Sequence, residues 1–363
     1  MKKVLFVINS HLANAGVPNV LMQIVRSLKD EFSFDIIVGS SKQGFYDEEF
    51  LSYGGQIFRH DLQDYSKSKL GYFKRGKQTA NMVKSVLKQS KYNVIHCNNG
   101  EESGYALKVA KAFNVPVRIA HSHGKYFNRG KNIPARLYKH IGKKYAVKYS
   151  THRFACSNIA GETLFLGKPF QNVLNPINVD NYLQVVKREH DYIGLLQIGY
   201  YCALKNQLFS VKVLDEIKNN GYKAKLRFIG FDNGSGYIKK VENQVKNKNL
   251  CDDVEFLPSD YDKLKVFEET DFLLLPSTSE GLPLVALESQ SSNTYCLASN
   301  NVPNDVDMGL FSTLKINEEN SASVWARFII ENKDKNLSVN KQKLQTIKTE
   351  EYIKKIVLVY NKF

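Results

Sequence analysis

Residues 273–288 read LLLPSTSEGLPLVALE, and this stretch decides the fold. The apolar run Phe272–Leu275 has the length of a buried parallel strand, and a polar turn over Pro276–Ser279 follows it. The next apolar residues predict a helix over Leu284–Ser291. A strand, a polar turn and a helix in this order indicate a parallel α/β sheet, in which ligands bind outside the carboxyl ends of the strands.

The same turn carries candidate binding groups. The backbone N–H groups of Gly281, Leu282 and Leu284 would lie at the start of the helix, where anions bind. Glu280 borders this opening, and Glu288 follows about two helical turns later. A carboxylate beside a phosphate is unfavourable unless it accepts hydroxyl groups, so the pair predicts a phosphate ligand that also carries a sugar. The alternative is that Glu280 is a loop residue near an N-cap and Glu288 a surface residue.

Short apolar runs alternate with amphipathic stretches along the whole chain. The strands expected in the first half are Val4–Ile8, Phe34–Val38, Val94–Cys97, Val117–Ala120 and Phe154–Cys156, with helices over Val17–Leu28, Thr79–Leu87 and Glu102–Ala112. The second half repeats the pattern with strands Gly194–Ile198, Leu226–Ile229, Val254–Leu257, Phe272–Leu275 and Tyr295–Ala298, and with helices Leu208–Lys218, Gly236–Lys246 and Leu284–Ser291.

This alternation predicts the α/β class, with two doubly wound Rossmann-like domains. We place the N-terminal domain at residues 1–175 and the C-terminal domain at residues 176–345. The last segment, 346–363, contains an amphipathic stretch over Glu350–Tyr360. We expect this helix to pack back toward the N-terminal domain.

The composition excludes several classes of protein. Of 363 residues, 43% are apolar and 24% charged, which is ordinary for a globular chain and excludes disordered, collagen-like and coiled-coil proteins. The five cysteines form no C-x-x-C pair, so we expect a reducing cytosol and neither a disulfide framework nor a structural zinc site. The apolar run Val4–Ile8 is too short for a signal peptide, and no apolar stretch approaches the ~18–20 residues that span a bilayer.

The net charge of +15 is unevenly distributed. Lys and Arg outnumber Asp and Glu by 27 to 11 within residues 1–175, and residues 103–161 contain no acidic residue. Such a field attracts phosphate-rich partners. Nucleic acid is not expected among them, because the chain has no nucleic-acid recognition motif.

The region Lys125–Lys148 combines this charge with apolar residues. Leu137, Ile141, Tyr145 and Tyr149 recur every four positions, as on one face of a helix. A basic amphipathic helix predicts binding to an anionic membrane surface, with these residues toward the lipid: Arg136, Lys139, Lys143, Lys144 and Lys148. The alternative is that the apolar stripe packs on the first sheet and only the basic face is exposed.

Histidines and paired aspartates raise the question of a metal. His96 ends one expected strand, and His121 and His123 end the next, so all three could share one edge of the sheet. A metal site, a ligand contact for His123 and a structural role remain open, with the ligand contact favoured. The patterns Asp260–Asp262 and Asp305–Asp307 could bind a metal, but Asp is also a common N-cap.

Taken together, these motifs resemble the retaining GT-B glycosyltransferases of family 4, the group 1 type, and especially the bacterial enzymes of capsule and exopolysaccharide synthesis. The Glu-x7-Glu pair and its Pro-Ser…Glu-Gly-Leu-Pro-Leu context match the motif of that family in residues and spacing. Four other segments match in the order of the family: Ala15-Gly16, Ala120–Gly124, Asn175–Asn178, and Gly199 with Lys205-Asn206.

The resemblance implies two Rossmann-like domains that face a central cleft. It implies metal-independent transfer of a sugar, with retention, from a nucleoside-diphosphate sugar such as a UDP-sugar. The acceptor would be lipid-linked or a glycan in bacterial surface polysaccharide synthesis. No cofactor is implied besides the donor substrate. The enzyme would be cytoplasmic and peripheral on the inner face of the cell membrane.

The family also implies roles for single residues. Glu280 would hold hydroxyls of the donor sugar, Glu288 would hold the ribose, and His123 would lie near the sugar and the leaving group. Lys205 would neutralise the diphosphate, because preorganised donors stabilise the charge that develops there. Further donor-binding positions are Gly16, Gly199, Gly281, Leu282, Pro283 and Leu284.

Two positions depart from the family pattern. Tyr200 stands where the family usually has an arginine, and a tyrosine supplies no fixed positive charge. Pro18 stands where the family often has an acidic residue. Two alternatives therefore stay open: a catalytically degenerate binding or scaffold subunit, and a sugar-nucleotide epimerase of the same architecture.

Overall fold

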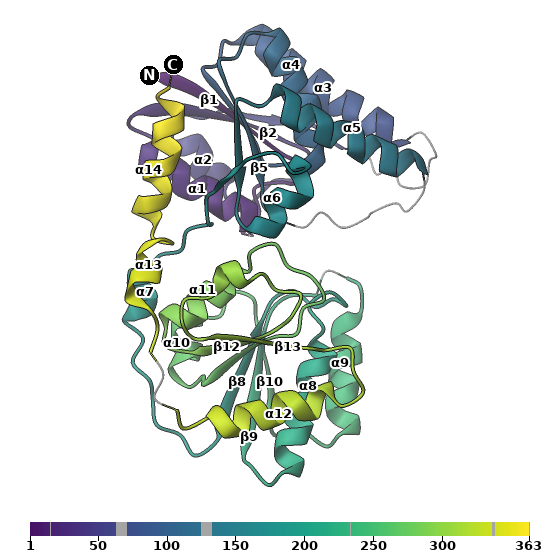
Figure 1. The fold of residues 1–363 in the computed structure, drawn as a ribbon, viewed down its shortest axis with the longest axis vertical. Helices are drawn as coiled ribbons and strands as arrows, with labels where there is room; N and C mark the ends of the chain where they lie inside the picture. The colour runs from purple at the N-terminus through teal and green to yellow at the C-terminus, as the bar shows by residue number, and fades with distance from the viewer. Residues whose placement is uncertain (15, 63–70, 125–132, 233, 336–337, 363) are drawn as a thin grey trace. The chain divides into compact units, whose positions relative to one another are not determined.

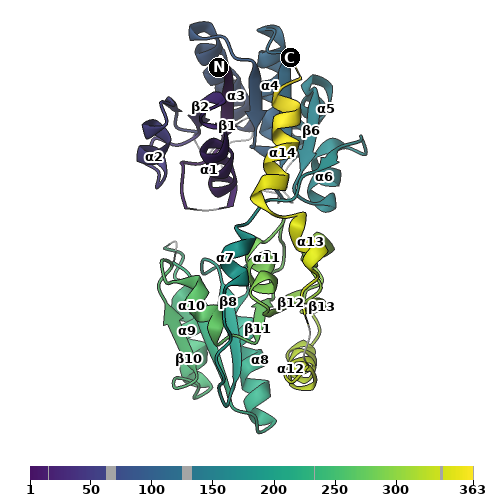
Figure 2. The same ribbon diagram turned by 90° about the vertical axis from the view of Figure 1, so that its left-hand side faces the viewer.

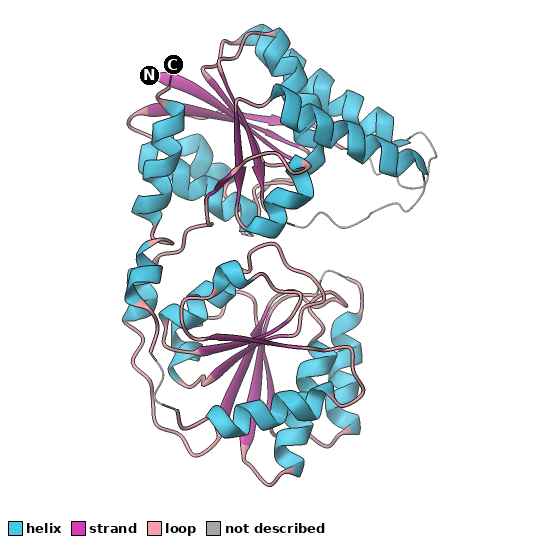
Figure 3. Ribbon diagram, viewed as in Figure 1, coloured by secondary structure: helices cyan, strands magenta, loops and turns pink. Residues whose placement is uncertain are grey.

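The computed structural model describes residues 1–363 except 15, 63–70, 125–132, 233, 336–337 and 363. The chain forms two compact units (Figure 1). Unit 1 consists of Met1–Pro176 and Thr349–Phe363, and unit 2 of Ile177–Lys348. Each unit contains one parallel sheet with helices on both faces (Figure 3), which confirms the predicted pair of doubly wound α/β domains.

The sheet of unit 1 has seven parallel strands in the order β3-β2-β1-β4-β5-β6-β7. The interior strand β1 is buried from Val4 to Ile8, because other strands flank it and helices cover both of its faces. The strands are β1 (Lys2–Ile8), β2 (Phe32–Val38), β3 (Ile57–Arg59), β4 (Val94–Cys97), β5 (Val117–Ser122), β6 (His152–Ala155) and β7 (Gln171–Asn172).

The helices of unit 1 form two layers (Figures 1 and 2). Helices α3, α4 and α5 pack side by side on one face of the sheet, and α1 packs beside α14 on the other face. Tyr352, Ile356 and Tyr360 of α14 are fully buried in the core beside α1, so the last helix of the chain completes unit 1. The helices are α1 (Gly16–Leu28), α2 (Asp47–Ser52), α3 (Gly71–Gln89), α4 (Ser103–Ala112), α5 (Ile133–Tyr149), α6 (Asn158–Phe165) and α14 (Thr349–Tyr360), with a 3-10 turn at Gly100–Glu102.

Unit 2 has a six-stranded parallel sheet in the order β10-β9-β8-β11-β12-β13. Its core contains the fully buried Trp325, whose ring lies edge-on against Phe209 and whose N–H donates to the Lys315 carbonyl at 3.0 Å. The strands are β8 (Ile193–Ile198), β9 (Ala224–Ile229), β10 (Val254–Leu257), β11 (Phe272–Leu275), β12 (Tyr295–Ser299) and β13 (Phe311–Leu314). The helices are α7 (Val179–Leu183), α8 (Gln207–Asn219), α9 (Tyr237–Asn247), α10 (Lys263–Glu268), α11 (Leu284–Ser291), α12 (Ser321–Asn332) and α13 (Lys341–Gln345), with a 3-10 turn at Asn304–Val306.

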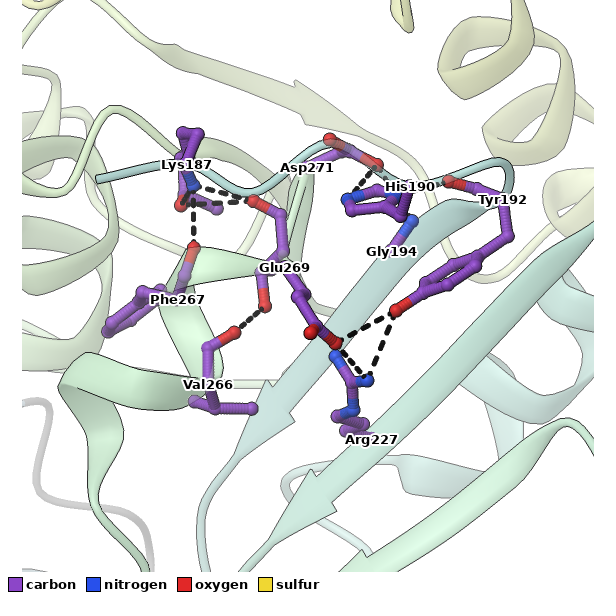
Figure 4. Close-up of polar contacts among 11 residues, drawn as sticks. Lys187, His190, Tyr192, Gly194, Arg227, Val266, Phe267, Glu269 and Asp271 are labelled. Atoms are coloured by element: carbon purple, nitrogen blue, oxygen red, sulfur yellow. Dashed lines mark hydrogen bonds and ion pairs between the residues drawn. The ribbon is translucent and has the colours of Figure 1, made fainter. Parts of the chain in front are cut away.

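A polar cluster fastens the segment before β8 to the start of β11 (Figure 4). The Lys187 ammonium donates to the carbonyls of Phe267 and Thr270 at 2.8 and 2.7 Å and to the Thr294 hydroxyl at 2.5 Å. Asp271 accepts the Gly194 N–H at 2.7 Å. Burial lowers the pKa of Lys187 to about 8. These contacts lie at the amino ends of β8 and β11, at the edge of the sheet opposite the loops that follow the strands. The buried Lys187 therefore has a structural role.

The structure corrects the alternative interpretation of α5, in which its apolar stripe packs on the first sheet. The predicted apolar stripe was Leu137, Ile141, Tyr145 and Tyr149, but the buried residues are Ala135, Tyr138, Gly142 and Ala146. Leu137 is 50% exposed. Gly142 and Ala146 allow α5 to pack closely against α4, and the large side chain of Tyr138 is buried against Tyr105. None of the helices in the described part of the chain has the length and apolar character that a bilayer-spanning segment needs.

Two glycines set the distance between α4 and α5. A Cβ atom on Gly104 would lie 2.0 Å from the Gly142 carbonyl oxygen and 2.7 Å from the Ala146 amide nitrogen. A Cβ on Gly142 would lie 2.4 Å from the Glu101 carbonyl oxygen. Gly104 is therefore required for the close approach of α4 to α5, and Gly142 for the approach of α5 to the 3-10 turn that precedes α4.

We predict that Gly104→Ala lowers the free energy of unfolding by roughly 1–3 kcal/mol, because the added methyl group forces α4 away from α5. Denaturant unfolding of the intact chain measures the change. Gly16→Ala is the matched control, since a Cβ at Gly16 meets no atom of the described residues within 4 Å. Equal stability of the two variants would contradict this account of the packing.

Candidate functional site

Each of the two glutamates of the Glu-x7-Glu pair forms an ion pair with a lysine of unit 2. The Lys205 ammonium lies 2.6 Å from Oε1 of Glu280. The Lys263 ammonium lies 3.0 and 2.9 Å from the two carboxylate oxygens of Glu288. The side chains of Glu280 and Glu288 are only 11% and 10% exposed. These carboxylates are therefore part of a mostly buried, charge-balanced site rather than free surface charges.

The first pair depends on two loops that follow neighbouring strands. Residues 199–206 follow β8 and residues 276–283 follow β11, and these strands pair in parallel. The Thr278 N–H donates to the Leu204 carbonyl at 2.9 Å, and the Asn206 side chain donates to the Pro276 carbonyl at 3.3 Å. The loops are thereby held together, and Lys205 meets Glu280.

Backbone conformation also contributes to this arrangement. Gly199 has a φ of 150°, in a region that favours glycine, and the aliphatic part of Lys205 packs beside it. A Cβ at Gly199 would lie 3.3 Å from Cε of Lys205. Gly199 therefore leaves room for the Lys205 side chain. This role is separate from the predicted role of Gly199 in donor binding.

The predicted residues Gly281, Leu282, Pro283 and Leu284 lead into helix α11. Pro283 is the N-cap residue, and its ring carries no hydrogen-bond acceptor. The first amides of an α-helix lack partners within the helix, so those of α11 can meet an anion. The loop and the start of α11 lie directly after Glu280, which bonds Lys205.

Glu288 has a second partner that the sequence did not indicate. The Tyr182 hydroxyl hydrogen-bonds Glu288, and the Tyr182 ring lies edge-on against Phe267. Burial, together with the negative charge of Glu288, raises the pKa of Tyr182 well above its usual range. Glu288 is thus oriented from two sides, by Lys263 of α10 and Tyr182 of α7. Neither partner has a spacing to Glu288 that marks it in the sequence.

In unit 1 the three histidines do come together in one column, in which His96 and His121 are buried and His123 is half-buried. His96 Nδ1 lies 2.8 Å from the Tyr360 hydroxyl, and His96 Nε2 lies 3.1 Å from His121 Nδ1. The rings of His121 and His123 are 3.9 Å apart, and His123 Nε2 lies 2.7 Å from the Asn98 side-chain oxygen.

Burial keeps these histidines neutral at pH 7. It lowers the pKa of His96 to about 3 and that of His121 well below its usual value. It lowers the pKa of His123 to about 4, and a hydrogen bond with Asn175 opposes this shift. A neutral His123 can donate one hydrogen bond and accept another, as a contact with a hydroxyl group requires.

A buried acid missed by the sequence interpretation lies near the ends of β1 and β4. Glu102 accepts a hydrogen bond from Asn9 at 2.6 Å and pairs with Arg75 at 2.5 Å. Burial raises the pKa of Glu102, and Arg75 opposes the shift. Asn9 also accepts a hydrogen bond from Asn99, so β1, β4 and α3 are joined by one polar network.

One aspartate in each of the two candidate metal-binding Asp-x-Asp patterns has a structural partner. Among the described residues, no group of three or more His, Cys, Asp or Glu side chains is arranged to hold a metal ion. Asp262 caps α10 by accepting the Leu264 N–H at 2.9 Å. Asp307 accepts the Gly309 N–H at 2.7 Å and pairs with Lys343 at 2.9 Å.

The remaining predicted residues lie as follows. Gly16 is the first residue of α1, whereas its predicted neighbour Ala15 lies outside the described residues. Tyr200 is 39% exposed, and its ring lies 5.9 Å from that of Phe231.

On α5, Arg136, Lys144 and Lys148 are exposed, whereas Lys139 and Lys143 are half-buried. Residues 125–132, where the basic region begins, lie outside the described residues.

Comparison with known proteins supports one family. Residues 179–308 match the model of the family "Glycosyl transferases group 1". EpsF of Bacillus subtilis strain 168, which is named as a glycosyltransferase, is 27% identical over 90% of this chain and 87% of its own. The capsular polysaccharide biosynthesis glycosyltransferase CapH of Staphylococcus aureus is 24% identical over 88% of each chain.

Solved structures agree on the fold. HepE of Anabaena, in complex with UDP and glucose, superposes with a TM-score of 0.77 at 14% identity over the whole of both chains. The lipopolysaccharide outer core galactosyltransferase WaaB superposes with a TM-score of 0.69 at 17% identity over 98% of both chains. The predicted GT-B fold is confirmed.

We predict that acidification destabilises unit 1 through its histidine column. The unfolded chain binds protons at histidine below about pH 6.5, whereas folded His96 and His123 stay neutral until about pH 3 and 4. The stability is therefore complete above pH 6.5 and is lost as the pH falls. For one such histidine the loss at pH 5 is about 2 kcal/mol.

Denaturant unfolding at pH 7 and pH 5 tests this, with His96→Gln expected to reduce the pH dependence by about 2 kcal/mol. His140→Gln, at an exposed position of α5, is the control and should leave the dependence unchanged. An unchanged dependence in His96→Gln would show that His96 does not titrate in this way.

Proposed function

We propose that the chain is a retaining group 1 glycosyltransferase that transfers a sugar from a UDP-sugar to a lipid-linked or glycan acceptor. The observation that carries the proposal is the pairing of Glu280 with Lys205 and of Glu288 with Lys263, within the segment that matches the family model. The match and the relatives support a group 1 glycosyltransferase of polysaccharide synthesis.

The donor and acceptor classes rest on the relatives. HepE of Anabaena was solved with UDP and with UDP-glucose. An Escherichia coli relative, 22% identical over 59% of this chain, is named as a galactosyltransferase that uses UDP-Gal and a diphosphoundecaprenol-linked GlcNAc. These names favour a uridine donor and a lipid-linked acceptor for this chain.

The proposed chemistry is charge stabilisation at the leaving diphosphate. As the bond between the sugar and the phosphate breaks, negative charge grows on the phosphate oxygens. The Lys205 ammonium and the first amides of α11 are fixed donors at that charge, so the reaction needs no metal ion. Glu280 accepts hydroxyls of the donor sugar, and Glu288 accepts those of the ribose. On unit 1, neutral His123 can form a hydrogen bond with a hydroxyl group.

We predict that Glu280→Gln lowers turnover of the UDP-sugar by about 10²–10³-fold, because the carboxylate that orients the sugar and balances Lys205 is removed. Donor hydrolysis and sugar transfer to a lipid-linked acceptor would be measured by release of UDP. Glu319→Gln, at an exposed position of unit 2, is the control and should keep full activity.

Thermal unfolding with UDP, GDP, ADP or CDP, each with and without Mg²⁺, identifies the nucleotide. A nucleoside diphosphate at 100 times its Kd should add about 2.7 kcal/mol of stability. Stabilisation by UDP without Mg²⁺ would support the donor and the metal-independent mechanism. Binding of a nucleotide without turnover would instead favour the binding or scaffold subunit, an alternative that is raised by Tyr200 in place of an arginine. Conversion of the donor sugar without transfer would favour the epimerase.

We also propose that α5 attaches the enzyme to an anionic membrane surface. Ile133 and Leu137 are 80% and 50% exposed, and the exposed Arg136, Lys144 and Lys148 lie on the same side of the helix, opposite its buried residues. Apolar side chains beside basic ones are the pattern of an interfacial helix.

We predict that replacing Arg136, Lys144 and Lys148 with Glu releases the protein from vesicles that contain phosphatidylglycerol. Each basic residue contributes about 1 kcal/mol at such a surface, so binding should fall by about 100-fold or more. Sedimentation with vesicles measures it. The control reverses three exposed lysines of α9, Lys239, Lys240 and Lys246, with the same change in net charge. Equal loss in both variants would contradict a specific role for α5.

A further inference from the structure

We propose that Lys263 is a positioning residue that acts through Glu288: it balances the charge of this carboxylate and so allows a nucleoside diphosphate to bind beside it. The inference rests on the proposed function, because it assumes that Glu288 holds the ribose of a nucleotide. It adds a residue of α10, whereas Glu288 belongs to α11, and sequence analysis did not identify it.

The contact geometry supports an action on the carboxylate. The Lys263 ammonium lies at 3.0 Å from one oxygen of Glu288 and at 2.9 Å from the other, so it bridges both. Two oxygens of a carboxylate can accept about four hydrogen bonds. Lys263 takes one on each oxygen and Tyr182 adds another, so Glu288 keeps capacity for a ribose hydroxyl.

The burial of the pair gives the reason for the balancing charge. The Glu288 side chain is only 10% exposed, so water screens its charge poorly. A nucleoside diphosphate brings further negative charge to the same site. Without a cation, a buried carboxylate would repel this ligand even while it bonds the ribose. Lys263, with a side chain 39% exposed, supplies this cation from the rim of the site.

Glu280 follows the same principle with a different lysine. Lys205 lies 2.6 Å from Oε1 of Glu280, and both side chains are mostly buried. Each carboxylate that would accept hydroxyls of the donor therefore has its own lysine. In this scheme Lys205 lies near the diphosphate and attracts it directly, whereas Lys263 acts through Glu288.

The scheme makes a distinctive prediction about coupled mutations. Lys263→Met should weaken UDP binding by about 10-fold or more, because Glu288 becomes an unbalanced negative charge. In the Glu288→Gln background the same change should cost less than about 2-fold, since no carboxylate remains to be balanced. Lys263→Arg should retain UDP affinity close to that of the unmodified chain, because the guanidinium restores the cation.

Calorimetric titration of the full chain with UDP measures these affinities, and thermal unfolding without ligand confirms that each variant is folded. Lys265→Met is the matched control: Lys265 lies on the same helix and is exposed, so the variant loses the same charge without a contact to Glu288 that the structure records. This variant should bind UDP as the unmodified chain does.

The outcomes separate the inference from the function on which it rests. If Lys263→Met weakens UDP binding equally with Glu288 and with Gln at position 288, then Lys263 contacts the ligand or acts only on folding, and the inference is overturned. An equal loss in Lys265→Met would overturn it too, since any positive charge would then suffice. If the unmodified chain binds no UDP, GDP, ADP or CDP, the proposed function fails, and the inference fails with it.

Discussion

The parallel pairing of β8 with β11 is the constraint on which the site of unit 2 depends. Leu195 and Leu196 pair with Phe272 and Leu273, so both strands run in the same direction and end at the same edge. The loops that follow must then meet, and the bond from the Thr278 N–H to the Leu204 carbonyl fixes them. Residues 75 positions apart, Lys205 and Glu280, become neighbours for this reason.

The two ion pairs are better explained by ligand binding than by stability. An ion pair that leaves water loses hydration, and this loss often cancels the attraction between the charges. Replacing such a pair with apolar residues of similar volume commonly costs nothing. Two mostly buried lysine–glutamate pairs on one domain, at a strand end and along the helix that follows it, therefore need a reason other than folding. Under the proposed function, the hydroxyl groups of a charged donor supply that reason.

The sequence was sufficient for the features that depend on local patterns. Short apolar runs marked the central strands, and the strand–turn–helix over residues 273–288 marked the Glu-x7-Glu segment. Strands β3, β7 and β13 were missed, because β3 and β13 have only half-buried residues and β7 is two residues long. Lys263 and Tyr182 were missed because only tertiary packing brings them to Glu288.

Helix α5 shows why an apolar period alone did not identify the buried face. The period of four among Leu137, Ile141, Tyr145 and Tyr149 left packing on the first sheet open as the alternative to lipid contact. In the structure, small residues lie where the backbones of α4 and α5 meet, at Gly142 and Ala146, and Tyr138 is buried beside them.

The two units handle buried titratable groups in opposite ways. In unit 2 the carboxylates of Glu280 and Glu288 are each paired with a lysine ammonium. In unit 1 the histidine column stays neutral, because burial makes protonation costly and no carboxylate among the described residues bonds these rings. Tyr360 closes the column from the last helix of the chain, so the neutral arrangement depends on a residue 264 positions from His96. A neutral imidazole can bond a hydroxyl without adding charge, whereas a leaving diphosphate needs fixed cations. Under the proposed function, the neutral column of unit 1 suits contacts with hydroxyl groups, and the lysine-paired carboxylates of unit 2 suit a domain that binds a charged donor.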